Sequence, residues 1–475
     1  MLEGLEAVEI NFSVCSSIID FRIDANTYKK DYIKSDVLIN SKSNSTIEDF
    51  STSVQNFGAY SLCNSINFVD SGIPFLMTQN VRHNYIDWNI ERFVDKESHE
   101  LLSKSHCKKG QVLVTMAGEY LGRVAVYDRD EICSSNQAIA KVTLKKNLNP
   151  YIVSTFLNSI HGQNQINRFK TITGQPNINM SLIKSLKVPA FSESFQIQIE
   201  KLIKESETNR NNTSLKYQQA ETILLETIGL NNFEPSTDGV NVKSFKDSFL
   251  GTGRLDAEYY QKKYEEVVSH IKAQTYDSLS NLVTIKKSIE PGSDAYSDEG
   301  LPFMRVSDFN KLGLSEPDKK LCSAFCSDNA ALIKKLKPKK ETILFSKDGS
   351  VGTAYMLRKD EDLITSGAIL HLTVKDKSQI LPEYLTLTLN SKLVQMQAER
   401  DAGGSIILHW RIGEIENVVV PIIDYAKQEK IAALVEESFR LKKQSEQLLE
   451  TAKQAVEIAI EQDEEAAMRY IETHT

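Results

Sequence analysis

The sequence is poor in cysteine and has neither a long apolar run nor a secretory signal. Six cysteines among 475 residues are too few for a disulfide scaffold. No apolar run approaches the ~20 residues that a bilayer span requires. The acidic first ten residues lack the basic-then-apolar layout of a signal peptide. We therefore expect a cytoplasmic protein that does not associate with a membrane.

Catalytic and cofactor-binding motifs are missing too. The sequence contains no P-loop and no nucleophile elbow, and its eight histidines do not cluster at ligand spacing. Cys322 and Cys326 have no second Cys or His pair nearby to complete a zinc site, so we interpret them as small thiols near a core. Asn149-Pro150-Tyr151 lacks the second proline of the Asn-Pro-Pro-aromatic motif of amino-methyltransferases and instead predicts a helix start. We expect no catalytic residue, metal or cofactor in this chain.

Charge is spread unevenly along the chain. The net charge of −8 would by itself disfavour a nucleic-acid partner. However, residues 426–475 carry 7 basic and 11 acidic side chains, whereas residues 301–358 carry 11 basic and 6 acidic ones. A local basic face, rather than the total, decides whether phosphates can bind. The composition therefore leaves nucleic-acid binding open.

The chain contains a long internal duplication. Segments 149–159 and 182–206 match segments 381–391 and 414–438 at one offset of 232 residues (381 minus 149). An entry sequence repeats at the same offset, with Arg-x-Asp-Ala starting at Arg22 and again at Arg254. A period this long indicates a duplicated domain, not a solenoid. We interpret the repeated Arg and Asp as an ion pair that anchors the start of each domain.

Each copy has the pattern of a mixed α/β domain of roughly 190 residues. Apolar strands flank a glycine-containing turn at 108–127 and again at 339–358. Alternating strands are predicted at 138–144 and 368–374, followed by helices that begin at Pro150 and Pro382. We predict the fold class α/β (mixed α+β), with two homologous domains.

A long helical run follows each domain and predicts a coiled coil. In the second run, apolar residues and two serines recur at alternating steps of three and four, at Ile431, Leu434, Ser438, Leu441, Ser445, Leu448, Ala452, Ala455 and Ala459. The first run has the matching positions Ile199, Leu202, Ala220 and Ile223, with polar Ser206, Asn209 and Thr213 between them. We expect the two helices to pair. The surplus at 456–471 has an apolar side, including Ile458, Ala459, Met468 and Ile471, that could contact a partner subunit.

These patterns divide the chain into five segments. We predict a first domain at 1–194, a first long helix at 195–230, a linker at 231–239, a second domain at 240–425, and a second long helix with a C-terminal extension at 426–475.

The turns differ between the two copies although the scaffold positions agree. The candidate DNA contacts of the first copy are Asn80, Arg82, His83, Trp88, Arg92, Arg123, Gln175 and Asn177. Those of the second are Arg305, Lys311, Lys347, Ser350, His409 and Arg411. Arg reads guanine and Asn or Gln reads adenine through paired hydrogen bonds, while lysine suits phosphates. Two copies of one scaffold with different turns should bind two different sequences.

The chain resembles the DNA-specificity (S) subunits of type I restriction–modification enzymes. The resemblance covers nearly the whole chain and rests on two variable domains that end in similar segments, 178–203 and 410–435, each followed by a long helix. The family usually shows Pro-Pro-Leu-x-Glu-Gln at the domain end; here Pro189 and Pro421 lack that sequence, but Gln196 and Gln428 keep the glutamine.

This resemblance implies the architecture and the partners. It implies two target-recognition domains joined by two antiparallel helices with a pseudo-twofold axis, which bind a bipartite asymmetric site on double-stranded DNA. It implies two methyltransferase (modification) subunits, which use S-adenosylmethionine, and restriction/translocase subunits, with no catalysis in this chain. A type IIB or other phage-defence methyltransferase system, and a non-catalytic protein-binding scaffold, remain as alternatives.

Overall fold

The computed structural model describes residues 8–18, 21–57, 60–171, 174–404 and 406–475, which form two compact units. Unit 1 contains the chain up to Arg210 together with Lys443–Thr475, and unit 2 is Asn211–Lys442. Two helices, α8 (Glu193–Thr227) and α17 (Tyr425–Glu461), contribute residues to both units. The division therefore runs through the long helices and not at their ends.

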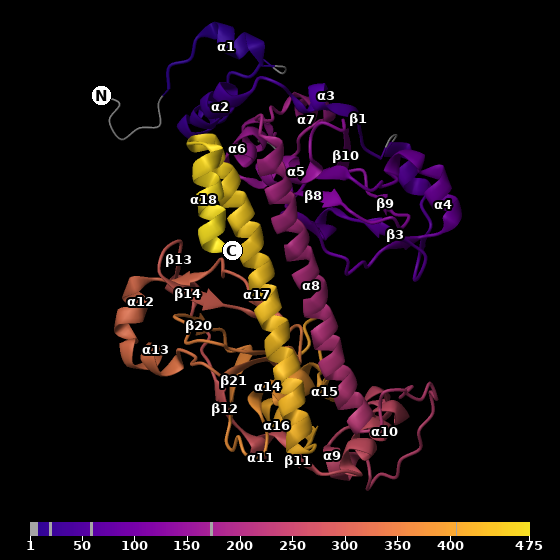
Figure 1. The fold of residues 1–475 in the computed structure, drawn as a ribbon. Helices are drawn as coiled ribbons and strands as arrows, with labels where there is room; N and C mark the ends of the chain where they lie inside the picture. Colours follow the sequence, from indigo (N-terminus) through magenta and orange to yellow (C-terminus); the bar gives the residue numbers. More distant parts are fainter. Residues whose placement is uncertain (1–7, 19–20, 58–59, 172–173, 405) are drawn as a thin grey trace. The chain divides into compact units, whose positions relative to one another are not determined.

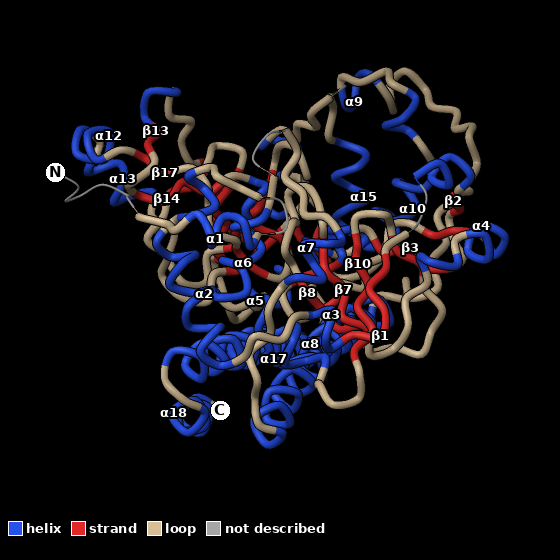
Figure 2. The backbone as a smooth tube through the Cα atoms, turned by 90° about the horizontal axis from the view of Figure 1, so that it is seen from above, coloured by secondary structure: helices blue, strands red, loops and turns tan. Residues whose placement is uncertain are grey.

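Unit 1 is built on a four-stranded antiparallel sheet. Its order is β1 (Ser51–Gln55), β10 (Ile139–Leu144), β7 (Gln111–Thr115) and β8 (Val124–Tyr127), and β10, β7 and β1 lie side by side in Figure 2. A second sheet has the order β2 (Phe68–Val69), β6 (Phe93–Val94), β3 (Ile73–Leu76) and β9 (Ser134–Ser135), and β4 (Val81–Arg82) pairs with β5 (Tyr85–Ile86). The remaining helices are α1 (Phe12–Ser17), α2 (Lys30–Lys42), α3 (Ile47–Phe50), α4 (Lys96–Leu101), α5 (Pro150–Asn158), α6 (Ile160–Phe169), α7 (Met180–Ser185) and α18 (Glu464–His474).

Unit 2 repeats the order of both four-stranded sheets and the hairpin of unit 1, and it has one further strand pair. Its main sheet has the order β12 (Val283–Lys287), β21 (Ile369–Val374), β18 (Ile343–Ser346) and β19 (Ala354–Met356). The second sheet is β13 (Tyr296–Ser297), β17 (Lys320–Leu321), β14 (Leu301–Met304) and β20 (Ile364–Thr365); the pairs are β15 (Phe309–Asn310) with β16 (Gly313–Leu314) and β11 (Tyr276–Ser278) with β22 (Val419–Pro421). Its helices are α9 (Phe249–Thr252), α10 (Lys262–Lys272), α11 (Leu279–Leu282), α12 (Ser323–Asp328), α13 (Ala330–Leu336), α14 (Pro382–Asn390), α15 (Lys392–Asp401) and α16 (Ile412–Glu416) (Figure 1). The predicted duplication of a mixed α/β domain is confirmed.

The proline of each repeat starts a helix, as predicted. Asn149 caps α5 by accepting a 2.9 Å hydrogen bond from the amide of Tyr151, and Pro150 occupies the first turn, where a missing N–H costs nothing. Helix α14 begins at Pro382 in the same way. The Asn-Pro-Tyr sequence is therefore a helix start and not a methyltransferase motif.

A glutamine, buried in unit 2 and half-buried in unit 1, joins the long helix to this helix start in both units. Gln428 is 1% exposed; its Oε1 accepts from the amide of Leu381 (3.0 Å), and its Nε2 donates to the carbonyl of Ile423 (3.0 Å). Gln196 makes the equivalent bonds with Asn149 and Phe191, each 2.9 Å long. Each glutamine thus fixes where the long helix leaves its domain.

The seam of the long helices contains buried hydroxyl groups. In unit 1 Ser206 donates to the carbonyl of Ser445 (2.9 Å), and in unit 2 Ser438 donates to the carbonyl of Thr213 (2.9 Å). Because a buried hydroxyl without a partner is costly, these bonds explain how polar residues occupy an apolar seam. In unit 1 the amide of Ser192, which precedes α8, also donates to Glu464 (2.8 Å), which follows α17. Within this unit the two long helices therefore run antiparallel.

The C-terminal extension corrects one expectation. Helix α18 starts at the cap Asp463 and turns back, so that Ala467 and Ile471 are buried in the core of unit 1 with Ala459 and Ile460. Its apolar side therefore faces its own unit, and not a partner subunit as the sequence suggested.

One core position differs in chemistry between the units. Lys141 on β10 is fully buried and donates to Ser135 Oγ (2.9 Å); at the same place in unit 2, His371 Nε2 lies 2.8 Å from Thr365 Oγ1. Burial lowers the pKa of Lys141 to about 8, and burial followed by the charge of Lys286 lowers the pKa of His371 to about 4. Both units therefore keep a hydrogen bond at this position, although the titratable side chain is a lysine in unit 1 and a histidine in unit 2.

None of the helices in the described residues combines the length and the apolarity that a membrane span requires.

Replacing Gln428 by alanine should destabilise unit 2. The change leaves the amide of Leu381 without its partner, which costs about 1–3 kcal/mol in unfolding free energy. Urea unfolding of the full chain measures this loss. Gln447→Ala, at an exposed position of the same helix, should change the free energy by less than about 0.5 kcal/mol. Equal effects of the two substitutions would contradict the role of Gln428.

Candidate nucleic-acid interface

Three loops meet on one side of the main sheet in unit 1. They are the β4–β5 hairpin, the turn between β7 and β8, and the segment 174–179. The amide of Asn84 donates to the carbonyl of Val124 (2.8 Å), and the amide of Gly118 donates to the carbonyl of Pro176 (3.0 Å). The loops are therefore held together by backbone bonds and form a continuous surface.

The central turn has its shape fixed by glycine. Gly118 and Gly122 have φ angles of 82° and 84°, a region that L side chains rarely adopt. Their counterparts Gly349 and Gly352 in unit 2 have φ angles of 72° and 82°. Thr115 Oγ1 accepts from the amide of Arg123 (2.8 Å), which closes the turn. The two glycines of the turn are common to both units, whereas the side chains and the length of the turn between them differ.

Two arginines of unit 1 lie near each other in this surface. Arg82 is half-buried and 3.6 Å from Asp87, and Arg123 lies over the ring of Tyr120, 4.4 Å from its centroid. One terminal nitrogen of Arg123 is buried without a hydrogen-bond partner. Burial and then the charge of Arg82 lower the pKa of Arg123. A guanidinium held beside a like charge, with a donor left over, suits an anion that the chain itself does not supply.

Most other predicted contacts of unit 1 lie on the same three loops. His83 is exposed, with Nδ1 2.9 Å from Asn158 Oδ1, and Gln175 and Asn177 are exposed on the 174–179 segment. Arg92 lies exposed beyond β5, stacked on Phe68, outside these loop contacts. Trp88 is half-buried against Tyr127.

Asn80 does not fit the contact role that was predicted. It is 6% exposed; its Oδ1 accepts from the amide of Met77 (3.0 Å), and its Nδ2 donates to the carbonyl of Asp87 (3.1 Å). Asp308 makes the same turn bond in unit 2 with the amide of Arg305 (2.8 Å). The alignment of 71–81 with 299–309 pairs Asn80 with Asp308, so the sequence contained the signal that this amide belongs to the scaffold.

Unit 2 presents the same three loops. The amide of Gly349 donates to the carbonyl of Leu408 (2.9 Å), which joins the β18–β19 turn to the segment 402–411. Phe309, at the start of the β15–β16 hairpin, packs in the same apolar cluster as Leu344 of β18. The set of predicted contacts is therefore brought together here as well.

The unit 2 side chains carry more ion pairs than those of unit 1. Lys347 pairs with Asp348, and His409 Nδ1 lies 2.9 Å from Asp348 Oδ1. Arg305 Nε lies 3.8 Å from Asp308 Oδ2, within ion-pair distance but beyond a hydrogen bond. The other three are exposed: Lys311 near the Tyr217 ring, Ser350 in the central turn, and Arg411 at the start of α16.

Some residues of this surface have no signal in the sequence. Arg129 stacks on Trp88, 3.8 Å from the ring centroid, and Arg210 of α8 stacks on Tyr85, 3.2 Å from its centroid. In unit 2, Lys442 reaches Gly313 of the corresponding hairpin. The contacts of Arg210 and Lys442 join each hairpin to a long helix, and all three contacts depend on distances that spacing in the chain does not give.

Fold and loops define a class of protein in which one scaffold is duplicated and carries two unlike sets of loops. Residues 275–451 match the family model of the type I restriction modification DNA specificity domain. This match agrees with the resemblance seen in the sequence over residues 275–451.

Two solved structures align with most of this chain at low identity. The S subunit of a type I restriction–modification system from M. genitalium is 13% identical, with 90% of this chain and 94% of that chain covered and a TM-score of 0.41. The HsdS subunit from Thermoanaerobacter tengcongensis is 13% identical, with 88% and 96% covered and a TM-score of 0.29. Among the curated proteins, none matches this sequence.

Arg123→Met should weaken DNA binding without loss of stability. Methionine keeps the apolar stem on Tyr120 and removes a charge that no carboxylate compensates, so the unfolding free energy should stay within about 0.5 kcal/mol. The affinity of the assembled complex for target duplex should fall about tenfold, measured by fluorescence anisotropy.

Arg168→Met is the matched control. Arg168 is 6% exposed, donates to the carbonyl of Thr27 (3.0 Å) and pairs with Asp36 (3.1 Å). Its loss should cost about 1–3 kcal/mol of stability. If Arg123→Met destabilised the chain as much as Arg168→Met, Arg123 would be a structural residue.

Proposed function

We propose that this chain is the DNA-recognition subunit of a type I restriction–modification complex. Each unit reads one half of a bipartite, asymmetric target on double-stranded DNA through its three loops. The observation that carries the proposal is the combination of a shared scaffold with unlike loop chemistry. Unit 1 presents exposed amides at Gln175 and Asn177, whereas unit 2 presents the aliphatic side chains Ile406, Ile407 and Leu408 at the corresponding place.

The proposed readers are the predicted contacts that are exposed or half-buried in each unit. In unit 1 they are Arg82, His83, Arg92, Arg123, Gln175 and Asn177, with Trp88 supporting them; in unit 2 they are Arg305, Lys311, Lys347, Ser350, His409 and Arg411. Guanidinium and amide groups make the paired hydrogen bonds that distinguish bases in the major groove. Lysine and histidine positions suit backbone phosphates, which orient the protein without specifying sequence.

Catalysis belongs to the partners in this proposal. Two methyltransferase subunits that use S-adenosylmethionine dock on the chain, and restriction/translocase subunits join them in the cytoplasm. Recognition for a type IIB or other phage-defence methyltransferase differs from this only in the partners, and the neighbouring genes distinguish the two. A protein-binding scaffold would instead show no salt-sensitive binding of duplex DNA by the purified complex.

Loop substitutions should alter one half-site at a time. Gln175→Ala with Asn177→Ala removes two amides from unit 1, and Lys347→Ala with Arg411→Ala removes two cations from unit 2. Each pair should reduce discrimination by about 1–3 kcal/mol at positions of a single half-site. Methylation of a library of randomised duplexes by the assembled complex, read by sequencing, measures this. The unaffected half-site is the internal control, and simultaneous change in both half-sites would contradict two separate readers.

Lengthening both long helices should widen the spacer between half-sites. Seven residues inserted after Arg210 in α8, with seven after Lys442 in α17, preserve the heptad seam and add about 10 Å to each helix. The preferred spacer should grow by about three base pairs. The same seven residues added after Thr475 serve as the control. An unchanged spacer in the lengthened protein would refute the idea that the helices set it.

A further inference from the structure

Each unit begins with an exposed apolar segment. We call residues 8–28 and 240–260 the entry segments; residues 19 and 20 lie outside the described part of the chain. Large hydrophobic side chains are exposed here in number: Val8, Phe12, Val14, Phe21 and Ile23 in the first, and Val240, Val242, Phe245, Phe249, Leu250 and Leu255 in the second. Soluble monomers rarely keep so many apolar groups together in water unless a partner covers them.

The apolar character is repeated at equivalent positions. At the offset of 232 residues, Val8, Ile10, Ile18 and Ile23 correspond to Val240, Val242, Leu250 and Leu255. Ile10 and Ile18 are half-buried, so the positions exposed in both copies are those of Val8 and Ile23. Val242 is 88% exposed, Ile23 75% and Leu255 70%. A side chain that stays apolar in both copies while it faces water is not explained by the core of either unit. We therefore expect a partner molecule to cover this side chain.

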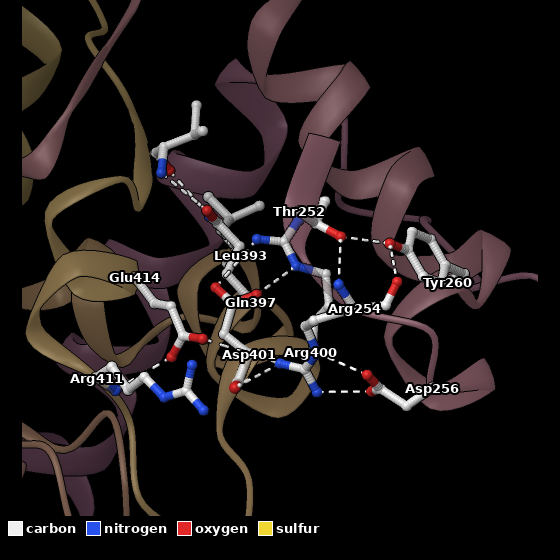
Figure 3. Close-up of polar contacts among 11 residues, drawn as sticks. Thr252, Arg254, Asp256, Tyr260, Leu393, Gln397, Arg400, Asp401, Arg411 and Glu414 are labelled. Carbon is white, nitrogen blue, oxygen red and sulfur yellow. Dashed lines mark hydrogen bonds and ion pairs between the residues drawn. The ribbon is translucent and has the colours of Figure 1, made fainter. Parts of the chain in front are cut away.

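Hydrogen bonds and an ion pair hold the end of each entry segment against its unit. Arg254 pairs with Asp256 (2.6 Å) and donates to the carbonyl of Asp401 (3.0 Å), while the Tyr260 hydroxyl donates to the carbonyl of Arg254 (3.0 Å) (Figure 3). Unit 1 has the same lock, with Arg22 paired to Asp24 (2.8 Å). The predicted entry ion pair is therefore present in both units.

Within each entry segment, exposed aromatic side chains contact each other. The rings of Phe12 and Phe21 are 5.7 Å apart in unit 1, and those of Phe245 and Phe249 are 5.5 Å apart in unit 2. A pocket of about 350 Å³ opens beside the second entry segment, lined by Val240, Leu255 and Tyr260 on one hand and by Asp238, Asn241 and Lys243 on the other. Its mixed lining would accept an amphipathic side chain of a partner.

The charges of the segments disfavour DNA as the occupant. Lys243 pairs with Glu265, and Arg254 pairs with Asp256, so these cations are already neutralised within unit 2. Phosphate binding needs cations that the protein leaves uncompensated. The chemistry fits an apolar protein surface instead.

We propose that the two entry segments are docking surfaces for two copies of one partner protein, each copy covering one segment with an apolar anchor. Because the same apolar positions occur twice, the same partner chain fits both. This inference rests on the proposed function, in which that partner is the methyltransferase subunit, and it adds the surface that this subunit covers. The segments repeat while the reading loops do not, as expected if the partner is common and the DNA half-sites differ.

Charge substitutions in one entry segment should release one partner copy. The variants are Val242→Glu with Leu250→Glu in unit 2, and Val8→Glu with Phe12→Glu in unit 1; all four positions are exposed, so the chain should still fold. Native mass spectrometry of the co-expressed complex should show two methyltransferase subunits on the wild-type chain. It should show one on either variant and none when both segments are changed, with the affinity of the lost copy reduced about tenfold or more.

Matched controls place glutamate at exposed apolar positions elsewhere. Ile132→Glu in unit 1 (61% exposed) and Leu332→Glu in unit 2 (41% exposed) should keep both partner copies. Circular dichroism and thermal unfolding of each chain confirm that the fold is unchanged.

Three outcomes would overturn the docking proposal, and they are distinguishable. Retention of both subunits by the entry-segment variants would contradict the docking surface and leave the proposed function intact. Self-association of the isolated chain, abolished by the same variants in analytical ultracentrifugation, would show that a second copy of this chain is the occupant. Absence of methyltransferase subunits from the wild-type complex would contradict the proposed function together with this partner.

Discussion

The structure depends on a side-chain amide that connects each long helix to its domain. Gln196 and Gln428 each accept from the amide that precedes a helix-starting proline and donate to a carbonyl of the loop before the long helix. Because Gln428 is buried and Gln196 is half-buried, a rotated or shifted helix would leave polar groups without partners, which costs more than the bonds themselves contribute. The direction in which the helix leaves the domain is therefore fixed equally in both units. The equivalent geometry of the two units depends on this constraint.

The duplicated fold could be predicted because the repeat preserves spacing as well as residue type. Arg22 and Arg254, Gln196 and Gln428, and the prolines of α5 and α14 recur at one offset, so the same bonds can form in the same places. The direction of α18 could not be predicted. Periodicity shows that a helix has an apolar side, but the surface that covers this side depends on the turn at Asp463 and on the space beside Ala459 and Ile460.

The candidate interface was predictable to the level of loops and not of individual side chains. An exposed Gln175 and a buried Asn80 are both carboxamides in turns, and residue type alone does not separate a group that can read a base from one that closes a turn. Comparison of the copies does separate them, because Asn80 faces Asp308 at a shared turn position. Stacking of Arg129 on Trp88 arises from segments 41 residues apart (129 minus 88) and has no counterpart in the repeat.

The two units show how such a scaffold divides its requirements. Where the main chain must keep its course, substitutions such as Lys141 for His371 keep the same hydrogen bond. On the loops, Arg123 has one buried terminal nitrogen without a hydrogen-bond partner, whereas Arg305 lies within ion-pair distance of Asp308. Buried polar atoms without a hydrogen-bond partner also occur in the apolar core, at Tyr217 and Trp410. The two units therefore share the course of the main chain, and they differ in how the charged side chains of the loops are paired.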